Sequence, residues 1–124
     1  MLLVDDHERI RGALRNLLAS YDDIEIVGEA RDGEEAIKRA GSCQPDVILM
    51  DINMPRMNGI EASGVIMKSW EDTIIIGLCV VQDSYTTEAF LKAGALAVVS
   101  KERIDDLYST IQRACENRRT SDAA

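Results

Sequence analysis

Residues 45–51, which read PDVILMD, carry the strongest fold signal in this chain. Four apolar residues in succession at positions 47–50 are typical of a strand that is covered on both faces, as in a parallel sheet. Pro45 introduces the run, and Asp51 follows it directly. We therefore predict a buried strand that ends in a carboxylate.

Apolar runs of strand length recur on both sides of this segment and alternate with helical patterns. The expected strands cover residues 1–4, 24–30, 47–50, 73–78 and 96–99, and a last helix carries an apolar stripe over residues 104–115. Because strand–helix alternation requires right-handed crossovers, the pattern predicts an α/β fold: a doubly wound, five-stranded parallel sheet with helices on both faces.

Polar and glycine residues mark several of the helix ends. Asp32 is followed three residues later by Glu35, which is the pattern of an N-cap with a capping-box partner. Asn58 is a candidate cap for the third helix, and Gly94 is placed as a C-terminal stop for the fourth. These signals set the expected helix boundaries.

Composition limits the possible functions. The 124 residues fit one domain, and 14 Lys and Arg against 22 Asp and Glu give a net charge of −8, which disfavours a nucleic-acid surface. No apolar run approaches the roughly 20 residues of a membrane-spanning helix, so we expect neither a membrane span nor a signal peptide. Cys43, Cys79 and Cys115 form no CxxC pair, which indicates a reducing, cytoplasmic compartment.

Charged residues follow three of the expected strands. Asp5 and Asp6 follow the first strand, Asp51 the third, and Lys101 the fifth. If the first and third strands are neighbours, the carboxylates converge at the carboxyl edge of the sheet, where doubly wound folds bind ligands. Such a cluster needs a cation, and oxygen ligands favour Mg²⁺. A carboxylate beside this cation and a lysine can accept a phosphoryl group.

Three segments carry a family resemblance. The segments LVDDH at residues 3–7, DINMPRMNG at residues 51–59 and VVSK at residues 98–101 resemble, in this order, the signature segments of the receiver domain of two-component response regulators. The resemblance implies a flavodoxin-like receiver fold with strand order 2-1-3-4-5 over residues 1–119. It also implies a sensor histidine kinase as the phosphoryl donor.

The resemblance assigns roles to individual residues. It implies that Asp51 is the phosphoacceptor and that Lys101 is the partner of the phosphate. It also implies that Asp51 contributes to a Mg²⁺ site in which Asp6 is a direct ligand, Asp5 binds through water and Asn53 contributes its main-chain carbonyl.

Further local features point to one group of regulators. The Asp-Asp-His opening, residues 60–62 and residues 93–95 are most similar to regulators that carry a LuxR-type helix-turn-helix after the receiver. We expect DNA binding only through such an output domain, which this chain lacks, with residues 120–124 as a tail or the start of a linker. Receivers often pair, so a homodimer is also an expectation.

Two positions depart from the family pattern. Cys79 stands where the family has Ser or Thr, and Val98 stands where it has Tyr or Phe. A thiol is a weak hydrogen-bond donor, so coupling between phosphorylation and loop movement should be weaker. These departures support an alternative function, a phosphorylation-independent protein-interaction module that keeps the receiver fold.

Other interpretations carry less weight. A phosphohydrolase with an aspartyl-phosphate intermediate typically has an Asp-x-Asp pair and a cap domain, whereas Asp5 and Asp6 are adjacent and the chain is short, so we expect a signalling switch and not an enzyme. Asp5 or Asp6 could also cap the first helix. His7, the only histidine, is assigned no role.

Overall fold

In the part of the chain that the structure describes, five parallel strands form one sheet in the order β2-β1-β3-β4-β5. The computed structural model describes the backbone of residues 1–80 and 83–123, with side chains as far as residue 117 in the last helix. The strands are β1 (Leu2–Val4), β2 (Gly28–Ala30), β3 (Val47–Asp51), β4 (Ile74–Cys79) and β5 (Ala97–Ser100). The predicted fold class and strand order are confirmed.

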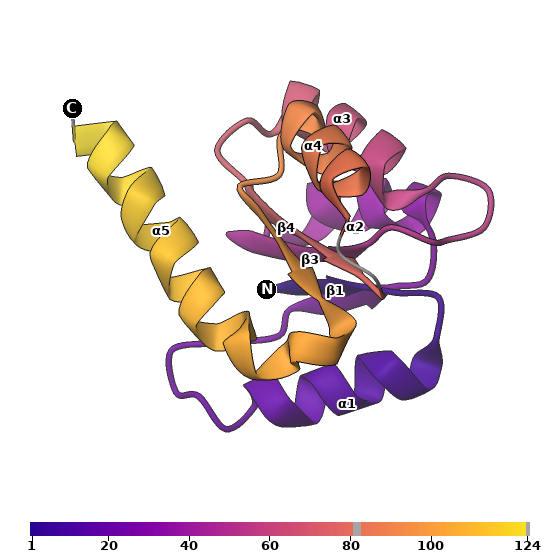
Figure 1. Cartoon of the computed structure of the whole chain (residues 1–124), viewed down its shortest axis with the longest axis horizontal. Helices are drawn as coiled ribbons and strands as arrows, with labels where there is room; N and C mark the ends of the chain where they lie inside the picture. Colours follow the sequence, from indigo (N-terminus) through magenta and orange to yellow (C-terminus); the bar gives the residue numbers. More distant parts are fainter. Residues whose placement is uncertain (81–82, 124) are drawn as a thin grey trace.

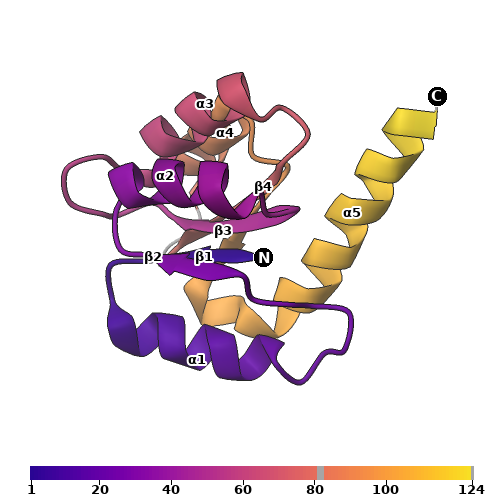
Figure 2. The same ribbon diagram turned by 180° about the vertical axis from the view of Figure 1, so that it is seen from behind.

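Among the described residues, five α-helices cover the two faces of this sheet (Figures 1 and 2). They are α1 (Glu8–Leu18), α2 (Gly33–Cys43), α3 (Gly59–Ser69), α4 (Ser84–Ala93) and α5 (Leu107–Ala123), and a 3-10 helix, Lys101–Asp106, leads from β5 into α5. The α2, α3 and α4 helices lie together on one face, whereas α1 and the first part of α5 lie on the other. The helices that connect successive parallel strands therefore lie on both faces of the one sheet.

Alternating strand side chains divide the core into two parts. In β3, Ile48 and Met50 pack toward α2, α3 and α4, whereas Val47 and Leu49 pack toward α1 and α5. This alternation follows from the two-residue period of a strand. Since both faces are covered, the run at residues 47–50 is fully apolar, as predicted.

The predicted cap residues are confirmed, whereas the Glu35 carboxylate lies 3.6 Å from Arg31 and does not complete the capping box predicted with Asp32. The side chain of Asp32 accepts a hydrogen bond from the Glu35 backbone N–H at 2.8 Å. Asn58 and Glu61 form a reciprocal capping box at the start of α3. Gly94 ends α4 with a φ of 117°, a left-handed conformation that favours glycine.

Two segments differ from the sequence prediction. The prediction of a strand over residues 24–30 is wrong for residues 24–27, because β1 begins at Leu2, which pairs with Gly28, and residues 24–27 lie beyond that paired ladder. The α5 helix continues through residues 120–123, the segment expected to be a tail or a linker, while residue 124 lies outside the described residues. The linker itself stays a prediction.

Candidate functional site: an acidic pocket at the carboxyl edge of the sheet

The charged residues at the carboxyl ends of β1, β3 and β5 come together at one edge of the sheet. Val4 of β1 is in register with Met50 of β3, so Asp5, which follows β1, lies beside Asp51, the last residue of β3. The potential ligand atoms of Asp5, Asp6, His7 and Asp51 all lie within 4.8 Å of one another. We call these four residues and Lys101 the acidic pocket.

Lys101 bridges two of the carboxylates. Its Nζ lies 2.7 Å from Oδ2 of Asp5 and 3.0 Å from Oδ1 of Asp51. Both carboxylate side chains are only 2% exposed, and that of Lys101 is 13% exposed. Burial alone would lower the pKa of Lys101, but its hydrogen bonds to Asp5 and Asp51 outweigh burial and raise this pKa. Lys101 therefore stays charged and offsets part of the carboxylate repulsion.

Asp51 keeps one carboxylate oxygen free. Its Oδ2 is buried and has no hydrogen-bond partner among the described residues, whereas Oδ1 faces Lys101. Burial raises the pKa of Asp51, the Lys101 hydrogen bond opposes this shift, and the charge of Asp5 adds to it. A buried oxygen that lacks a partner is costly unless a cation or another group binds it.

The donor set fits a hard divalent cation. Asp5, Asp6 and Asp51 supply carboxylate oxygens at a shared position, and such oxygens are the ligands that Mg²⁺ prefers. The side chain of Asp6 is 29% exposed, so an ion at this position would keep contact with water, as Mg²⁺ usually does. Asn53 is an exposed residue of the following loop, and its carbonyl as a ligand stays a prediction.

Glycine allows that loop to fold back against β3. The backbone N–H of Gly59 donates to the Ile52 carbonyl at 3.1 Å, and a Cβ at position 59 would overlap the main-chain oxygen of Asp51. A side chain there would displace either α3 or the end of β3. Gly59 therefore fixes the backbone that carries Asp51.

Arg11 stabilises the acidic pocket through the main chain of Asp5, and the sequence did not predict this role. Its Nη1 donates to the main-chain oxygen of Asp5 at 2.6 Å, and its Nε donates to Glu29 of β2 at 3.1 Å. The side chain is 11% exposed. The available signal was its position in α1, three residues before Leu14 and seven before Leu18, on the face that is buried.

His7 turns toward the carboxylates, although the sequence assigned it no role. Its Nδ1 lies 3.2 Å from Oδ1 of Asp5 and 3.0 Å from Oδ1 of Asp6. His7 also occupies the N-cap position of α1, where its side chain makes no capping bond. The suggestion that Asp5 or Asp6 caps α1 is therefore wrong, although Asp5 accepts the His7 backbone N–H at 2.9 Å.

The family described as Response regulator receiver domain matches residues 1–112. The chain belongs to this family. It is therefore a receiver domain of two-component signalling, as its acidic pocket and strand order indicate.

Individual relatives agree with this family. LiaR of Bacillus subtilis, a transcriptional regulatory protein, is 43% identical over 101 residues, which cover 82% of this receiver and 48% of LiaR. The response regulator GacA of Pseudomonas viridiflava is 36% identical over 101 residues, covering 82% and 47% of the two chains. The receiver thus spans about half the length of these curated relatives.

A solved structure agrees with the fold. A LuxR-family two-component response regulator from an Aurantimonas species superimposes on the receiver with a TM-score of 0.90 and 30% identity. The match covers 94% of this receiver and 84% of the other chain. The predicted similarity to LuxR-type regulators is confirmed.

The two atypical residues lie inside the receiver. Cys79 ends β4 and is 3% exposed, and Val98 of β5 is 9% exposed in the same core cluster. Burial raises the pKa of the Cys79 thiol, with the charge of Asp83 adding to the shift, so the thiol stays protonated. Both positions therefore carry small, neutral side chains.

A hydroxyl on β5 fixes the segment that follows Cys79, which sequence reasoning also missed. Ser100 lies opposite Cys79 in the β4–β5 register. Its Oγ donates to the main-chain oxygen of Val80 at 3.1 Å and accepts the backbone N–H of Glu102 at 3.2 Å. Ser100 thus joins the residue after β4 to the segment that begins with Lys101.

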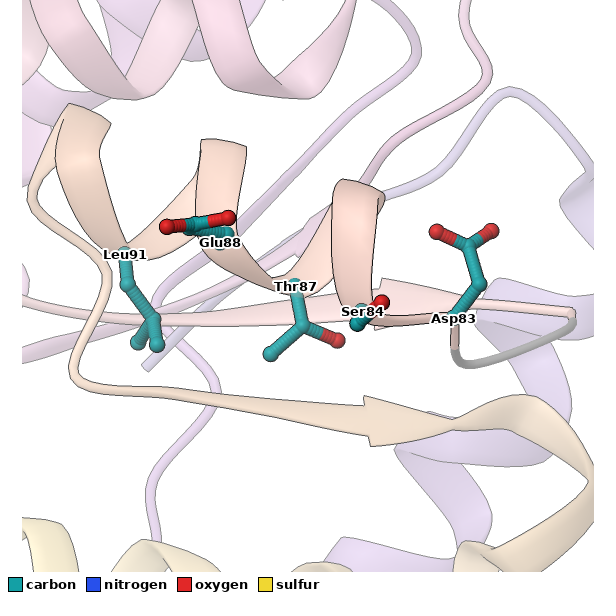
Figure 3. Close-up of a pocket in the computed structure, with 5 residues that line it drawn as sticks. All are labelled: Asp83, Ser84, Thr87, Glu88 and Leu91. Atoms are coloured by element: carbon teal, nitrogen blue, oxygen red, sulfur yellow. The ribbon is translucent and has the colours of Figure 1, made fainter.

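An open pocket also lies along α4 of the receiver (Figure 3). It is lined by Asp83, Ser84, Thr87, Glu88 and Leu91, and no residue of the acidic pocket lines it. In Figure 3, Thr87 and Leu91 extend toward the side of the helix on which β5 lies. The clustered carboxylates and Lys101 therefore lie at the acidic pocket and not along α4.

Among the helices that the structure describes, none has the length and apolar character needed to cross a membrane.

Proposed function

We propose that this receiver accepts a phosphoryl group on Asp51 from a sensor histidine kinase and changes conformation to control an output. The observation that carries the proposal is the state of Asp51. Its Oδ2 is buried and has no partner among the described residues, while Lys101 holds the other oxygen at 3.0 Å. A carboxylate with one free oxygen beside a fixed cation is arranged as a nucleophile.

The transfer forms one bond and breaks one. An Asp51 oxygen attacks phosphorus, the P–N bond to the donor imidazole breaks, and the leaving nitrogen recovers its electron pair and takes a proton. Lys101 supplies a positive charge within reach of the incoming phosphoryl oxygens. The attacking group is the ionised carboxylate, and burial, which raises the pKa of Asp51, makes this ionised form harder to reach.

Mg²⁺ fits the same pocket, where Asp5, Asp6, Asp51 and the Asn53 carbonyl would hold it. When bound, it lowers the repulsion between the Asp51 carboxylate and the phosphoryl oxygens. Arg11 donates to the main-chain oxygen of Asp5 and so anchors the backbone that carries this ligand.

The output belongs to the proposal as well. The similarity to LiaR, a transcriptional regulatory protein, supports control of transcription. A DNA-binding output domain, a cytoplasmic location and a homodimer as one form of the active state are further parts of the proposal. The receiver would act as a switch and not as an enzyme, apart from its own phosphorylation and dephosphorylation.

A second candidate is a phosphorylation-independent interaction module. The buried Cys79 and Val98 support it, because they replace the hydroxyl and the aromatic ring of the family pattern. Beryllofluoride, which mimics the phosphoryl group, separates the two functions. The switch predicts amide NMR shifts in α4, enlarged in Cys79→Ser; a bound mimic without shifts in α4 would favour the module.

Intact mass spectrometry tests the phosphorylation step. The receiver is incubated with Mg²⁺ and acetyl phosphate, and separately with a phosphorylated histidine kinase. We expect a labile gain of roughly 80 Da that Asp51→Asn lacks. Asp83→Asn, at the N-cap of α4, is the matched control and should retain the gain. No gain from either donor would contradict the proposal.

A further inference from the structure

We propose that His7 supplies an imidazole ligand to the acidic pocket, so that the pocket binds divalent transition-metal ions through a mixed nitrogen and oxygen ligand set. This inference rests on the proposed function, because it uses the same carboxylates. It adds the imidazole of His7, which is not among the proposed Mg²⁺ ligands, and it extends the ions that the pocket binds to divalent transition metals. Of the two ions compared below, Co²⁺ accepts imidazole readily, whereas Mg²⁺ favours oxygen.

The spacing of the ring nitrogen is that of a neighbouring ligand. Two ligands at right angles around an ion with bonds of about 2.1 Å lie about 3.0 Å apart. His7 Nδ1 lies 3.0 Å from Oδ1 of Asp6 and 3.2 Å from Oδ1 of Asp5. Each carboxylate oxygen thus stands from Nδ1 at the distance expected of a neighbouring ligand, and the ligand atoms of the whole set lie within 4.8 Å of one another.

A proton on the ring cannot satisfy all the nearby oxygens. Nδ1 carries one proton at most and is in hydrogen-bonding geometry only with Oδ1 of Asp5. Oδ1 of Asp6, although 3.0 Å away, makes no hydrogen bond to the described residues, and neither does the buried Oδ2 of Asp51. A single cation among these atoms would bind both oxygens and the ring nitrogen together.

The backbone of His7 is fixed, so the ring starts from a defined position. Its N–H donates to Asp5 Oδ1 at 2.9 Å, and its carbonyl accepts the Arg11 backbone N–H at 3.0 Å in the first turn of α1. The side chain itself is 62% exposed. The ring can therefore adjust by the few tenths of an ångström that coordination requires.

The sequence makes the test unambiguous, because His7 is the only histidine. Receiver without a histidine tag is prepared with natural and with ¹⁵N-labelled histidine, loaded with Mn²⁺, and measured by electron spin-echo envelope modulation. We expect a nitrogen modulation that changes with the isotope and is absent in His7→Gln. Spectra that do not depend on the histidine isotope would overturn the inference.

Affinities give a second, independent readout. For Co²⁺ we expect His7→Gln to weaken binding by about tenfold, and for Mg²⁺ by less than about twofold. Asp6→Asn is the control that places both ions in the pocket, and it should weaken both. Equal weakening of the two ions by His7→Gln would overturn the inference.

The two proposals can fail separately. Mg²⁺ binding and phosphorylation of Asp51 without a histidine isotope effect would overturn only the ligand role of His7. Failure of the wild-type receiver to bind either Mg²⁺ or Co²⁺ would overturn the pocket that both proposals share.

Discussion

Lys101 Nζ lies 3.0 Å from Oδ1 of Asp51, although β4 separates the two strands that these residues follow or end. Lys101 also contacts Asp5 at 2.7 Å, so one ammonium group serves two buried carboxylates. The acidic pocket is therefore a set of mutually dependent buried charges, in which removing any one member changes the cost of burying the others.

We expect Lys101→Met to destabilise the metal-free receiver by about 2–4 kcal/mol, because Asp5 and Asp51 would be buried without a cation. Mg²⁺ should restore part of the loss. Urea unfolding in EDTA and in saturating Mg²⁺ measures both effects. Lys92→Met, at an exposed position of α4, should change the free energy of unfolding by less than about 0.5 kcal/mol. Equal stability of Lys101→Met and wild type would contradict this account.

Asp51→Asn should stabilise the metal-free receiver, and more so as the pH rises. The folded pKa of Asp51 lies above its ordinary value of 3.8, so the folded state holds this proton more tightly than the unfolded chain does. Wild type therefore loses stability relative to the variant as pH rises through 3.8 and then through the folded pKa. Urea unfolding in EDTA between pH 3.5 and 7 should show a widening gap. A gap that narrows would mean that Lys101 stabilises the ionised Asp51 on balance.

Arg11→Met should lower the free energy of unfolding by about 2–3 kcal/mol, because the substitution leaves the Asp5 carbonyl without its charged donor. Mg²⁺ affinity should fall as well, since Asp5 would lose its support. Arg15 binds the same Glu29 but is 50% exposed, so Arg15→Met should cost less than about 1 kcal/mol. Thermal unfolding and calorimetric Mg²⁺ titration of both variants test this difference. Similar losses in the two would show that Arg11 acts only through Glu29.

Gly59→Ala should destabilise the receiver by about 2 kcal/mol or more and slow phosphorylation of Asp51, because the new Cβ meets the Asp51 main-chain oxygen. Gly64 offers a control in the same helix. A Cβ there meets nothing within 4 Å, so Gly64→Ala should raise the free energy of unfolding by about 0.5–1 kcal/mol. Urea midpoints that move in the same direction for both variants would refute the steric role of Gly59.

The sequence predicted the sheet because each strand is a short apolar run with a helical pattern behind it. It predicted Asp5, Asp51 and Lys101 because their place directly after strands, or at a strand end, puts them at the carboxyl edge. Residues 24–27 were misassigned because β-branched composition does not reveal where the partner strand begins.

The supporting residues could not be predicted in the same way. Arg11 and Ser100 bind main-chain oxygens of Asp5 and Val80, and a main-chain acceptor leaves no trace in side-chain identity. The orientation of His7 depends equally on the turn from β1 into α1. Tertiary geometry was needed for all three.

The central claim is that Asp51 carries the phosphoryl group, and borohydride trapping tests it most directly. Receiver phosphorylated in Mg²⁺ is reduced with borohydride, which converts an aspartyl phosphate to homoserine, and the digested peptides are sequenced by mass spectrometry. We predict homoserine at position 51 and unchanged aspartate at positions 5 and 6. Homoserine at another aspartate, or none in a receiver that has gained a phosphoryl group, would contradict the claim.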